Sequence, residues 1–328
     1  MTQMHTLEAE AKQPGRAYHE SRAISFWLNF FFFFARRTPL LVRWSRPFWM
    51  MLSRHFFVDY LRGGIRKNTH WLLGPDASEA DRRALTDRVL EHFYMFIHDI
   101  GRAGGLSREQ LEAQIDAVEG EDHFHEIRKL KRGAIIATAH MGSFEVGAAA
   151  VRSLEPRVHV AFQHDNLGAF DAIRHRLHEK LGLIEAVVDQ GWSAWLQVRD
   201  ALLNDEVVLI QADRTMPGQH GVAVPFMGGH LLMPLGPIKL AVMTGAPIVP
   251  VFAIRLPSGK VRLVIESPIV VDAERDRPRD EVPGPAMLQL TKVIEKQVRA
   301  HPEQWLMLHP AWMEDQAGGV TSRVGAEG

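Results

Sequence analysis

Short apolar runs alternate with longer stretches of helical character through the second half of the chain. The apolar runs fall at 134–139, 158–162, 184–188 and 207–211, and the helical stretches lie near 143–153, 168–181 and 192–204. Strands that alternate with helices favour a mostly parallel sheet with helices on both of its faces. The pattern therefore predicts an α/β fold.

The rest of the chain adds helices before this region and a different strand pairing after it. Ser78 is a plausible N-cap for a helix that extends to about residue 98, and Ser107 with Gln110 fits a capping box. The runs 247–254 and 261–266 flank a Pro-Ser-Gly turn, which predicts an antiparallel pair. Further elements are expected as a strand at 222–226 and helices at 235–244 and 285–300.

The N-terminal region carries the most unusual apolar run, which contains five consecutive phenylalanines at 30–34. Its apolar core, 23–35, is about 20 Å of helix, shorter than a hydrocarbon layer of about 30 Å. Arginines and aromatic residues alternate beyond it as far as Arg54, a pattern typical of a helix that lies in a membrane interface. The alternative is an apolar helix that packs on the protein core.

Composition narrows the class of protein without naming a function. A chain of 328 residues with 46% hydrophobic content can bury one large core, alone or with an appendage. The net charge of −1 gives no reason to expect a nucleic-acid partner. We expect no secretory signal in the polar, mixed-charge stretch 1–21, and the absence of cysteine excludes disulfides and thiolate metal sites. We expect a membrane-associated helical segment at 1–62, a main domain at 63–314 and a disordered tail at 315–328.

The first candidate site lies where the strand 134–139 ends. His140 is the next residue, Ser143 is placed to cap the following helix, and Glu145 falls in that helix's first turn. Ligands of parallel sheets bind beyond the carboxyl ends of the strands. A carboxylate beside Nδ1 would fix the tautomer and leave Nε2 as a proton acceptor, which makes His140 and Glu145 a candidate base. The alternative is a strand-end histidine with a solvated glutamate.

Other polar residues are expected to border the same cleft. Asp213 and Arg214 follow the strand 207–211, where an arginine can hold a phosphate or a developing oxyanion; a surface ion pair is the alternative. The backbone amides from Phe226 to Gly229 could face a ligand or form an ordinary turn.

Several histidines, arginines and tryptophans outside the candidate site are expected to have structural roles. His123 and His125 lack a third ligand at convincing spacing, so we predict no metal site. A solvated helix face is expected for Arg174, His175, Arg176 and His178, and core or interface positions for Trp305 and Trp312.

Four blocks of the chain together resemble a known family. "HMGSFE" matches the H-x4-D/E motif of the lysophospholipid and glycerolipid acyltransferase superfamily, and the rest of the chain looks like its bacterial branch, the lipid A biosynthesis (lauroyl/myristoyl) acyltransferases. The blocks at 211–229, 235–252 and 294–312, the last with the letters P-E-Q-W, resemble later blocks of that branch in the same order. The resemblance runs from about residue 22 to 314. Arg214 directly after Asp213 departs from the enterobacterial pattern and leaves the acceptor open.

The resemblance implies a glycerolipid acyltransferase-like fold and a reaction. An acyltransferase would move a fatty acyl chain from a thioester, usually of acyl carrier protein, to a hydroxyl or amine of a membrane lipid or glycolipid precursor, with no cofactor and no covalent intermediate. His140 and Glu145 would be catalytic, and Asp213, Arg214, Phe226 and Gly228 would bind substrate. The basic cluster Arg128, Lys129, Lys131 and Arg132 would meet the acidic carrier protein or be a solvated face. The expected location is the cytoplasmic face of the inner membrane.

Two rival functions follow from the same residues. A thioesterase or lipase would use water as the acceptor, although the chain lacks the G-x-S-x-G elbow of α/β-hydrolases. A non-catalytic membrane scaffold would use the fold only to bind lipid.

Overall fold

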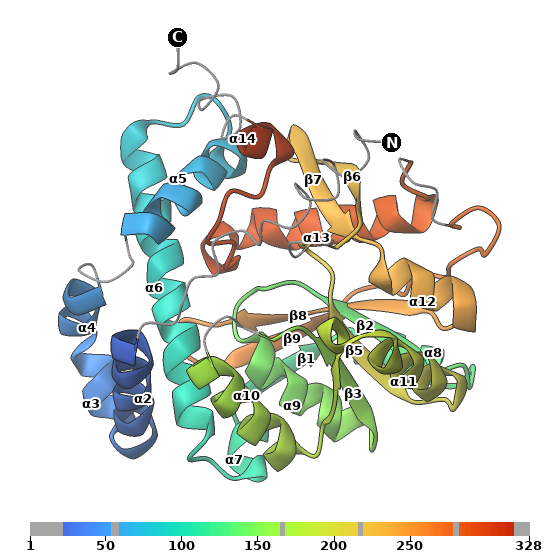
Figure 1. Ribbon diagram of the computed structural model, residues 1–328, viewed down its shortest axis with the longest axis horizontal. Helices are drawn as coiled ribbons and strands as arrows, with labels where there is room; N and C mark the ends of the chain where they lie inside the picture. Colours follow the sequence, from blue (N-terminus) through green and yellow to red (C-terminus); the bar gives the residue numbers. More distant parts are fainter. Residues whose placement is uncertain (1–21, 54–58, 165–167, 216–218, 278–281, 318–328) are drawn as a thin grey trace, which may run out of the picture.

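A mostly parallel sheet forms the centre of the protein. The computed structural model describes residues 22–53, 59–164, 168–215, 219–277 and 282–317. In these residues the main sheet has seven strands in the order β1-β9-β8-β2-β5-β3-β4 (Figure 1). Its strands are β1 (Ile115–Glu119), β2 (Ala134–Thr138), β3 (Val158–Phe162), β4 (Ile184–Val187), β5 (Val207–Gln211), β8 (Ile248–Arg255) and β9 (Val261–Ile265). The pairing of β8 with β9 is antiparallel and the other pairings are parallel. The predicted α/β fold and the predicted antiparallel pair are confirmed.

Helices cover both faces of the sheet. Neighbouring strand residues point to opposite sides, and because both sides carry apolar side chains, both need to be covered. Ile135 packs in one buried cluster and Ile136 in another. The first cluster takes its helical residues from α11 (Trp192–Leu203), α12 (Gly236–Thr244) and α13 (Pro285–Ala300). The second takes them from the end of α6 (Glu79–Ala103), α7 (Arg108–Glu112), α8 (Glu121–Arg128), α9 (Phe144–Leu154) and α10 (Gly168–Leu181). The continuous apolar runs of β2 and β5 are those of strands buried on both faces.

A separate hairpin follows β5. It consists of β6 (Gly221–Phe226) and β7 (Gly229–Pro234), which pair with each other and not with the main sheet. Met227 and Gly228 form its turn, with φ angles of 46° and 86°. Two successive positive φ angles match the tight turns that suit the twist of hairpin strands. β7 was not predicted, because its sequence mixes polar and apolar residues.

The first five helices of the described residues lie along one side of the sheet (Figure 1). They are α2 (Arg22–Arg37), α3 (Pro39–Trp44), α4 (Arg46–Ser53), α5 (Asp59–Leu73) and α6 (Glu79–Ala103). The N-cap predicted at Ser78 and the capping box predicted at Ser107 are confirmed at the starts of α6 and α7, and Ser78 also forms a capping box, with Asp81. The residues 1–21 and 54–58 lie outside the described part of the chain.

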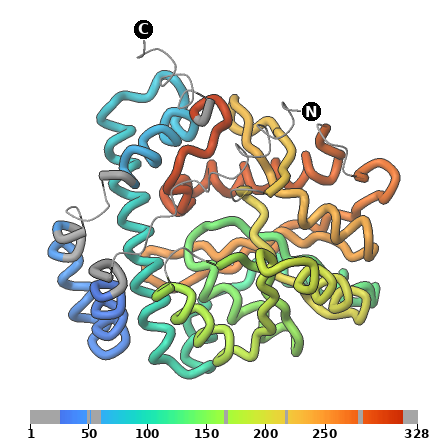
Figure 2. Tube along the Cα trace, in the orientation of Figure 1, coloured from blue at the N-terminus to red at the C-terminus, as the bar shows by residue number. Residues whose placement is uncertain are grey.

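The C-terminal segment returns to α5, as the Cα trace shows (Figure 2). The Asn68 side chain donates to the carbonyl oxygens of Met307 and His309 and accepts from the Ala311 amide. The domain boundary expected after residue 62 lies within α5. In the expected tail, residues 315–317 belong to α14 (Met313–Ala317), and residues 318–328 lie outside the described residues.

Candidate active site

The register of β2 and β5 brings His140 and Asp213 together. Thr138 pairs with Gln211 at the strand ends, and the Ala212 amide donates to the Thr138 carbonyl over 2.8 Å. His140 and Asp213 follow at the same edge. His140 Nδ1 lies 2.7 Å from Asp213 Oδ1, and the His140 amide donates to Oδ2 over 3.0 Å. A carboxylate at Nδ1 leaves Nε2 as the ring nitrogen with the lone pair.

Trp305 completes the setting of the Asp213 carboxylate. Its indole Nε1 donates to Oδ2 over 2.9 Å, and its side chain is buried. The surrounding segment is held to the histidine turn, since the Leu306 amide donates to the His140 carbonyl and the Gly142 amide to the Gln304 carbonyl. The prediction that Trp305 is a core aromatic is correct but misses this bond. The P-E-Q-W block was the signal that could have revealed it.

The turn after His140 is tightly constrained. Gly142 has φ of +60°, and a Cβ there would lie 2.0 Å from the Ala253 carbonyl oxygen, so the position requires glycine. Ser143 occupies the N-cap position of α9, but its side chain makes no capping bond. Its hydroxyl instead donates to Asp99 Oδ2 over 2.7 Å and accepts from the Arg255 guanidinium. The predicted capping role of Ser143 is therefore wrong.

The carboxylate at Nδ1 of His140 is Asp213 and not Glu145, which corrects the contact predicted from the sequence. Glu145 is buried in the first turn of α9, and its Oε2 lies 3.2 Å from Nε2 of His178 on α10. The strand neighbour reaches Nδ1 directly, whereas α9 starts in an orientation that brings Glu145 to α10. Glu145 still acts on His140 through its charge.

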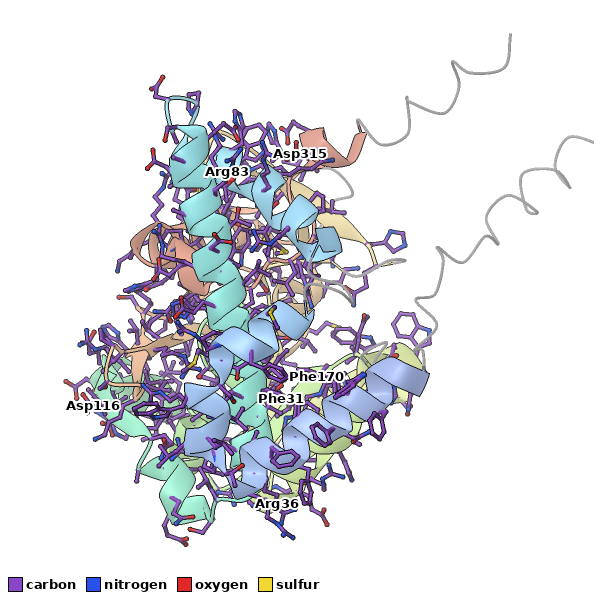
Figure 3. All side chains as sticks on the ribbon, turned by 90° about the vertical axis from the view of Figure 1, so that its left-hand side faces the viewer. Phe31, Arg36, Arg83, Asp116, Phe170 and Asp315 are labelled. Atoms are coloured by element: carbon purple, nitrogen blue, oxygen red, sulfur yellow. The ribbon has the colours of Figure 1, made fainter. Side chains whose placement is uncertain are left out.

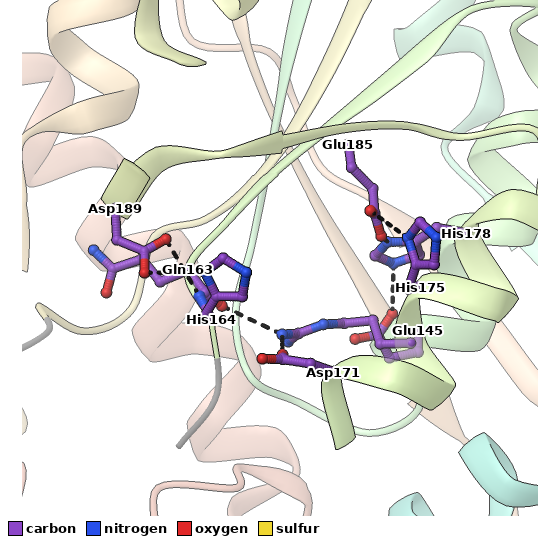
Figure 4. A network of polar contacts seen from close by, with 9 residues as sticks. Glu145, Gln163, His164, Asp171, His175, His178, Glu185 and Asp189 are labelled. Atoms are coloured by element: carbon purple, nitrogen blue, oxygen red, sulfur yellow. Dashed lines mark hydrogen bonds and ion pairs between the residues drawn. The ribbon is translucent and has the colours of Figure 1, made fainter. Parts of the chain in front are cut away.

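His178 belongs to a polar network that the sequence did not predict (Figure 4). Its Nδ1 lies 2.7 Å from Oε1 of Glu185, and His175 Nδ1 lies 2.7 Å from the other oxygen of Glu185. On the same helix, Arg174 pairs with Asp171 and donates to the Gln163 carbonyl. The predicted solvated face is wrong for His178, which is fully buried, and for Arg174, which is mostly buried. His175 and Arg176 are exposed as expected.

The electrostatic setting keeps His140 neutral. Burial and the positive charge of Arg214 lower the pKa of His140, although Asp213 and Glu145 oppose the shift. Burial alone would raise the pKa of Asp213, but the charges and hydrogen bonds of His140, Arg214 and Trp305 lower it below its usual range. At neutral pH the site therefore holds a neutral imidazole against a carboxylate, the state that a general base needs.

The electrostatic setting of His178 is the opposite. Burial alone would lower the pKa of His178, but hydrogen bonds and charges from Glu145 and Glu185 raise it to about 9. The same contacts outweigh the burial of Glu145 and lower its pKa. His309, by contrast, has a pKa lowered to about 4 by burial and by Arg214. Arg214 thus acts on both His140 and His309, and its substrate-binding role stays a prediction.

Phe226 and Gly228 lie in the hairpin. The Phe226 carbonyl accepts from Nε1 of Trp312 over 3.0 Å, and the Phe226 ring contacts Trp305 and Trp312. Trp305 therefore links Phe226 to Asp213. Gly228 lies in the β6–β7 turn, and its substrate-binding role stays a prediction. Within the described residues, no group of three or more His, Cys, Asp or Glu side chains could hold a metal ion.

The fold and this site define an α/β enzyme with a buried histidine–carboxylate pair at the carboxyl edge of its sheet. The chain belongs to the bacterial lipid A biosynthesis acyltransferase family, whose match covers residues 13–314, and it is an acyltransferase. A phosphatidylinositol mannoside acyltransferase of Mycobacterium tuberculosis is 25% identical over 281 residues, which covers 76% of this chain and 77% of the relative. A lipid A biosynthesis lauroyltransferase of Escherichia coli is 28% identical over 252 residues, with 76% and 78% covered.

Proposed function

We propose that the enzyme transfers a fatty acyl chain from a thioester, carried by acyl carrier protein, to a hydroxyl or amine of a membrane lipid or glycolipid precursor. The family and the relatives' names support acyl transfer to lipids of this kind. The observation that carries the mechanism is the 2.7 Å contact between Nδ1 of His140 and Asp213 at the sheet edge.

In the proposed reaction His140 is the general base. Nε2 takes the proton of the acceptor's O–H or N–H as its oxygen or nitrogen attacks the thioester carbon. The new acyl bond forms, the C–S bond breaks, and the imidazolium returns the proton to the leaving thiolate. Asp213 holds the tautomer and stabilises the imidazolium, and the positive charge of Arg214, which acts on His140, would stabilise the oxyanion. Base assistance of this kind contributes about 10²–10⁴-fold, or roughly 3–5 kcal/mol.

Binding at a membrane surface is supported by the apolar face of α2, α3 and α4 (Figure 3). The phenylalanine run divides in two: Phe31 and Phe32 are buried against the protein, while Phe30 and Phe33 are exposed. The buried phenylalanines fit the interpretation of a helix packed on the core, and the exposed ones support the proposed contact with a membrane. Exposed apolar side chains continue at Leu40, Leu41, Trp44, Phe48 and Met51. Within the described residues, no helix combines the length and the apolar character that crossing a bilayer would require.

The charges around this face fit an anionic lipid surface. Arg36 and Arg37 end α2, Arg43 lies in α3, and the Arg37 guanidinium lies 5.1 Å from the ring centre of Phe33. Apolar groups beside arginines are the composition of interfacial helices. The proposed location is the cytoplasmic face of the inner membrane, where acyl carrier protein would deliver the chain.

The basic cluster before β2 is a weaker candidate for the carrier-protein surface. Arg128 is mostly buried and pairs with Glu155 and Asp205, each over 2.6 Å. Lys129 pairs with Glu126. These contacts make Arg128 a structural residue, so the carrier-protein proposal rests on the family alone.

The test of function uses acyl-carrier-protein thioester as the donor and membrane lipid extracts as the acceptor, with lipid mass spectrometry as the readout. Varying donor at several acceptor concentrations should give intersecting double-reciprocal lines, because both substrates are bound together. Parallel lines with an acyl adduct on the protein would contradict direct transfer. Release of free fatty acid at the same rate without acceptor would favour the hydrolase instead.

The membrane surface has a matched pair of tryptophans for its test. Trp44 in α3 is 83% exposed and Trp192 in α11 is 84% exposed. Trp44→Ser together with Phe33→Ser should weaken sedimentation with anionic phospholipid vesicles at least tenfold, whereas Trp192→Ser should leave it unchanged. Equal losses from both changes would contradict the assigned face.

A further inference from the structure

His178 has a contact geometry that, with both of its glutamates ionised, only a charged ring satisfies. Its Nε2 faces Glu145 at 3.2 Å and its Nδ1 faces Glu185 at 2.7 Å (Figure 4). A neutral imidazole carries one N–H and would leave one of these carboxylates opposite a lone pair. The side chain of His178 is 1% exposed and that of Glu145 is 9% exposed. The two charges therefore interact in a largely water-free environment.

Each element around His178 contributes to this arrangement. Glu145 comes from α9 and Glu185 from β4, while Phe162 of β3 packs edge-on against the His178 ring at 5.7 Å. On α10 itself, His175 binds the outer oxygen of Glu185, and Arg174 adds a positive charge that acts on Glu145. When His140 is protonated, its charge also acts on Glu145. Glu145 is thus coupled to both histidines, by contact to His178 and through charge to His140.

We propose that His178 is a positioning residue for acyl transfer, which holds Glu145 as a carboxylate anion beside the catalytic histidine. A buried carboxyl without a counter-charge takes up a proton, because burial disfavours the ionised form. The anion of Glu145 favours the imidazolium that forms on His140 during transfer. Glu185 acts one step further from His140, because its contact with Nδ1 keeps the proton on His178. The inference rests on the proposed function, since it assigns a role within that reaction.

Removal of the His178 charge should convert Glu145 into a titrating group. In His178→Gln the amide can still donate to Glu145, but the positive charge is gone. The acid limb of the kcat/KM–pH profile should then move to higher pH, because Glu145 must lose its proton before the site is active. Near pH 6 we expect about a tenfold deficit relative to wild type, equal to about one pKa unit of interaction, and this deficit should close above pH 8.

His175→Gln is the matched control. His175 is on the same helix, three residues earlier, and binds the same Glu185, but it is exposed and does not contact Glu145. Its profile should coincide with that of wild type. Adding His178→Gln to Glu145→Gln should cause no further shift. If His178→Gln keeps the wild-type limb, or if His175→Gln shifts it equally, the positioning role is overturned.

A stability measurement separates this inference from the proposed function. His178 has a pKa raised to about 9, so its stabilisation is present below its unfolded value near 6.5 and is lost as pH rises through 9. The melting temperature of wild type should therefore fall more between pH 8 and 10 than that of His178→Gln. Equal falls would show that His178 is not a cation between Glu145 and Glu185, whether or not acyl transfer is seen. If the expected difference appears but the wild-type protein transfers no acyl chain, the charged contacts of His178 stand. In that case both the proposed function and the positioning role are wrong.

Discussion

The protein contains two buried histidine–carboxylate contacts that differ in charge. His140 has one carboxylate at Nδ1 and the positive charge of Arg214 nearby, and its pKa is lowered. His178 has a carboxylate at each ring nitrogen, and its pKa is raised to about 9. Burial acts in the same direction on both histidines. The number of carboxylates and the sign of the next charge therefore decide which ring stays neutral as a base and which becomes a fixed cation.

The difference also assigns the two carboxylates near His140. Asp213 binds the His140 ring and fixes its tautomer. Glu145 is paired with the His178 cation instead and acts on His140 only through its charge. The H-x4-E spacing alone predicts one His–Glu pair and would assign both roles to Glu145. Separate substitutions at each contact can distinguish them.

The largest effect is expected at the neutral histidine. His140→Ala should lower acyl transfer by about 10²–10⁴-fold through loss of the base, with the melting temperature and vesicle binding retained. Transfer is measured as acylated lipid by mass spectrometry. A variant with more than about a tenth of the wild-type rate would exclude the base role, since that is under 1.4 kcal/mol of barrier.

Asp213→Asn should come next. The asparagine keeps the shape of the contact but loses the charge, and it can stabilise the wrong tautomer of His140, so we expect a fall in kcat of about 10²–10³-fold. Steady-state kinetics with saturating donor checks this. A normal kcat with only a raised KM would indicate that Asp213 binds substrate instead.

Glu145→Gln should cost less than Asp213→Asn. Loss of a charge that acts through space should lower kcat/KM by about tenfold, one pKa unit of interaction. The two variants are compared in one assay at pH 7.5. If Glu145→Gln loses more activity than Asp213→Asn, Glu145 and not Asp213 is the main carboxylate partner of His140, as the sequence spacing suggested.

The smallest effect on His140 itself is expected from Arg214→Gln, separate from any loss of kcat through the proposed oxyanion role of Arg214. Without this positive charge the pKa of His140 rises, so the acid limb of kcat/KM should move to higher pH, as measured from pH 5 to 8. Arg176→Gln, an exposed arginine on α10, is the control and should not move the limb. A limb that moves to lower pH in Arg214→Gln would mean that this charge does not act on His140.

Strong local patterns made much of the fold predictable. The bounds of β3, β5 and α13 coincide with the predicted ranges, since continuous apolar runs and a helical period have few alternative structures. β1 was missed because its sequence, IDAVE, carries two acidic residues in five and is only partly buried. Residues at strand ends could be placed at the same sheet edge, which brought His140 and Asp213 together in the prediction.

Contacts that depend on tertiary geometry could not be predicted. The orientation of α9 decides whether Glu145 reaches His140 or α10, and spacing along the chain does not fix it. Trp305 lies 92 residues from Asp213 in the sequence, and only the folded segment beside β2 shows that its indole is a donor to the site. The burial of His178 depends in the same way on the packing of α10 against α9.

The central claim concerns the protonation of two rings, which ¹⁵N NMR of histidine-labelled protein measures directly. Signals are assigned from their loss in His140→Ala and His178→Gln. At pH 7.5 the account predicts a neutral His140 with its proton on Nδ1, and a doubly protonated His178 that titrates near pH 9. A charged His140, or a neutral His178, at that pH would contradict it.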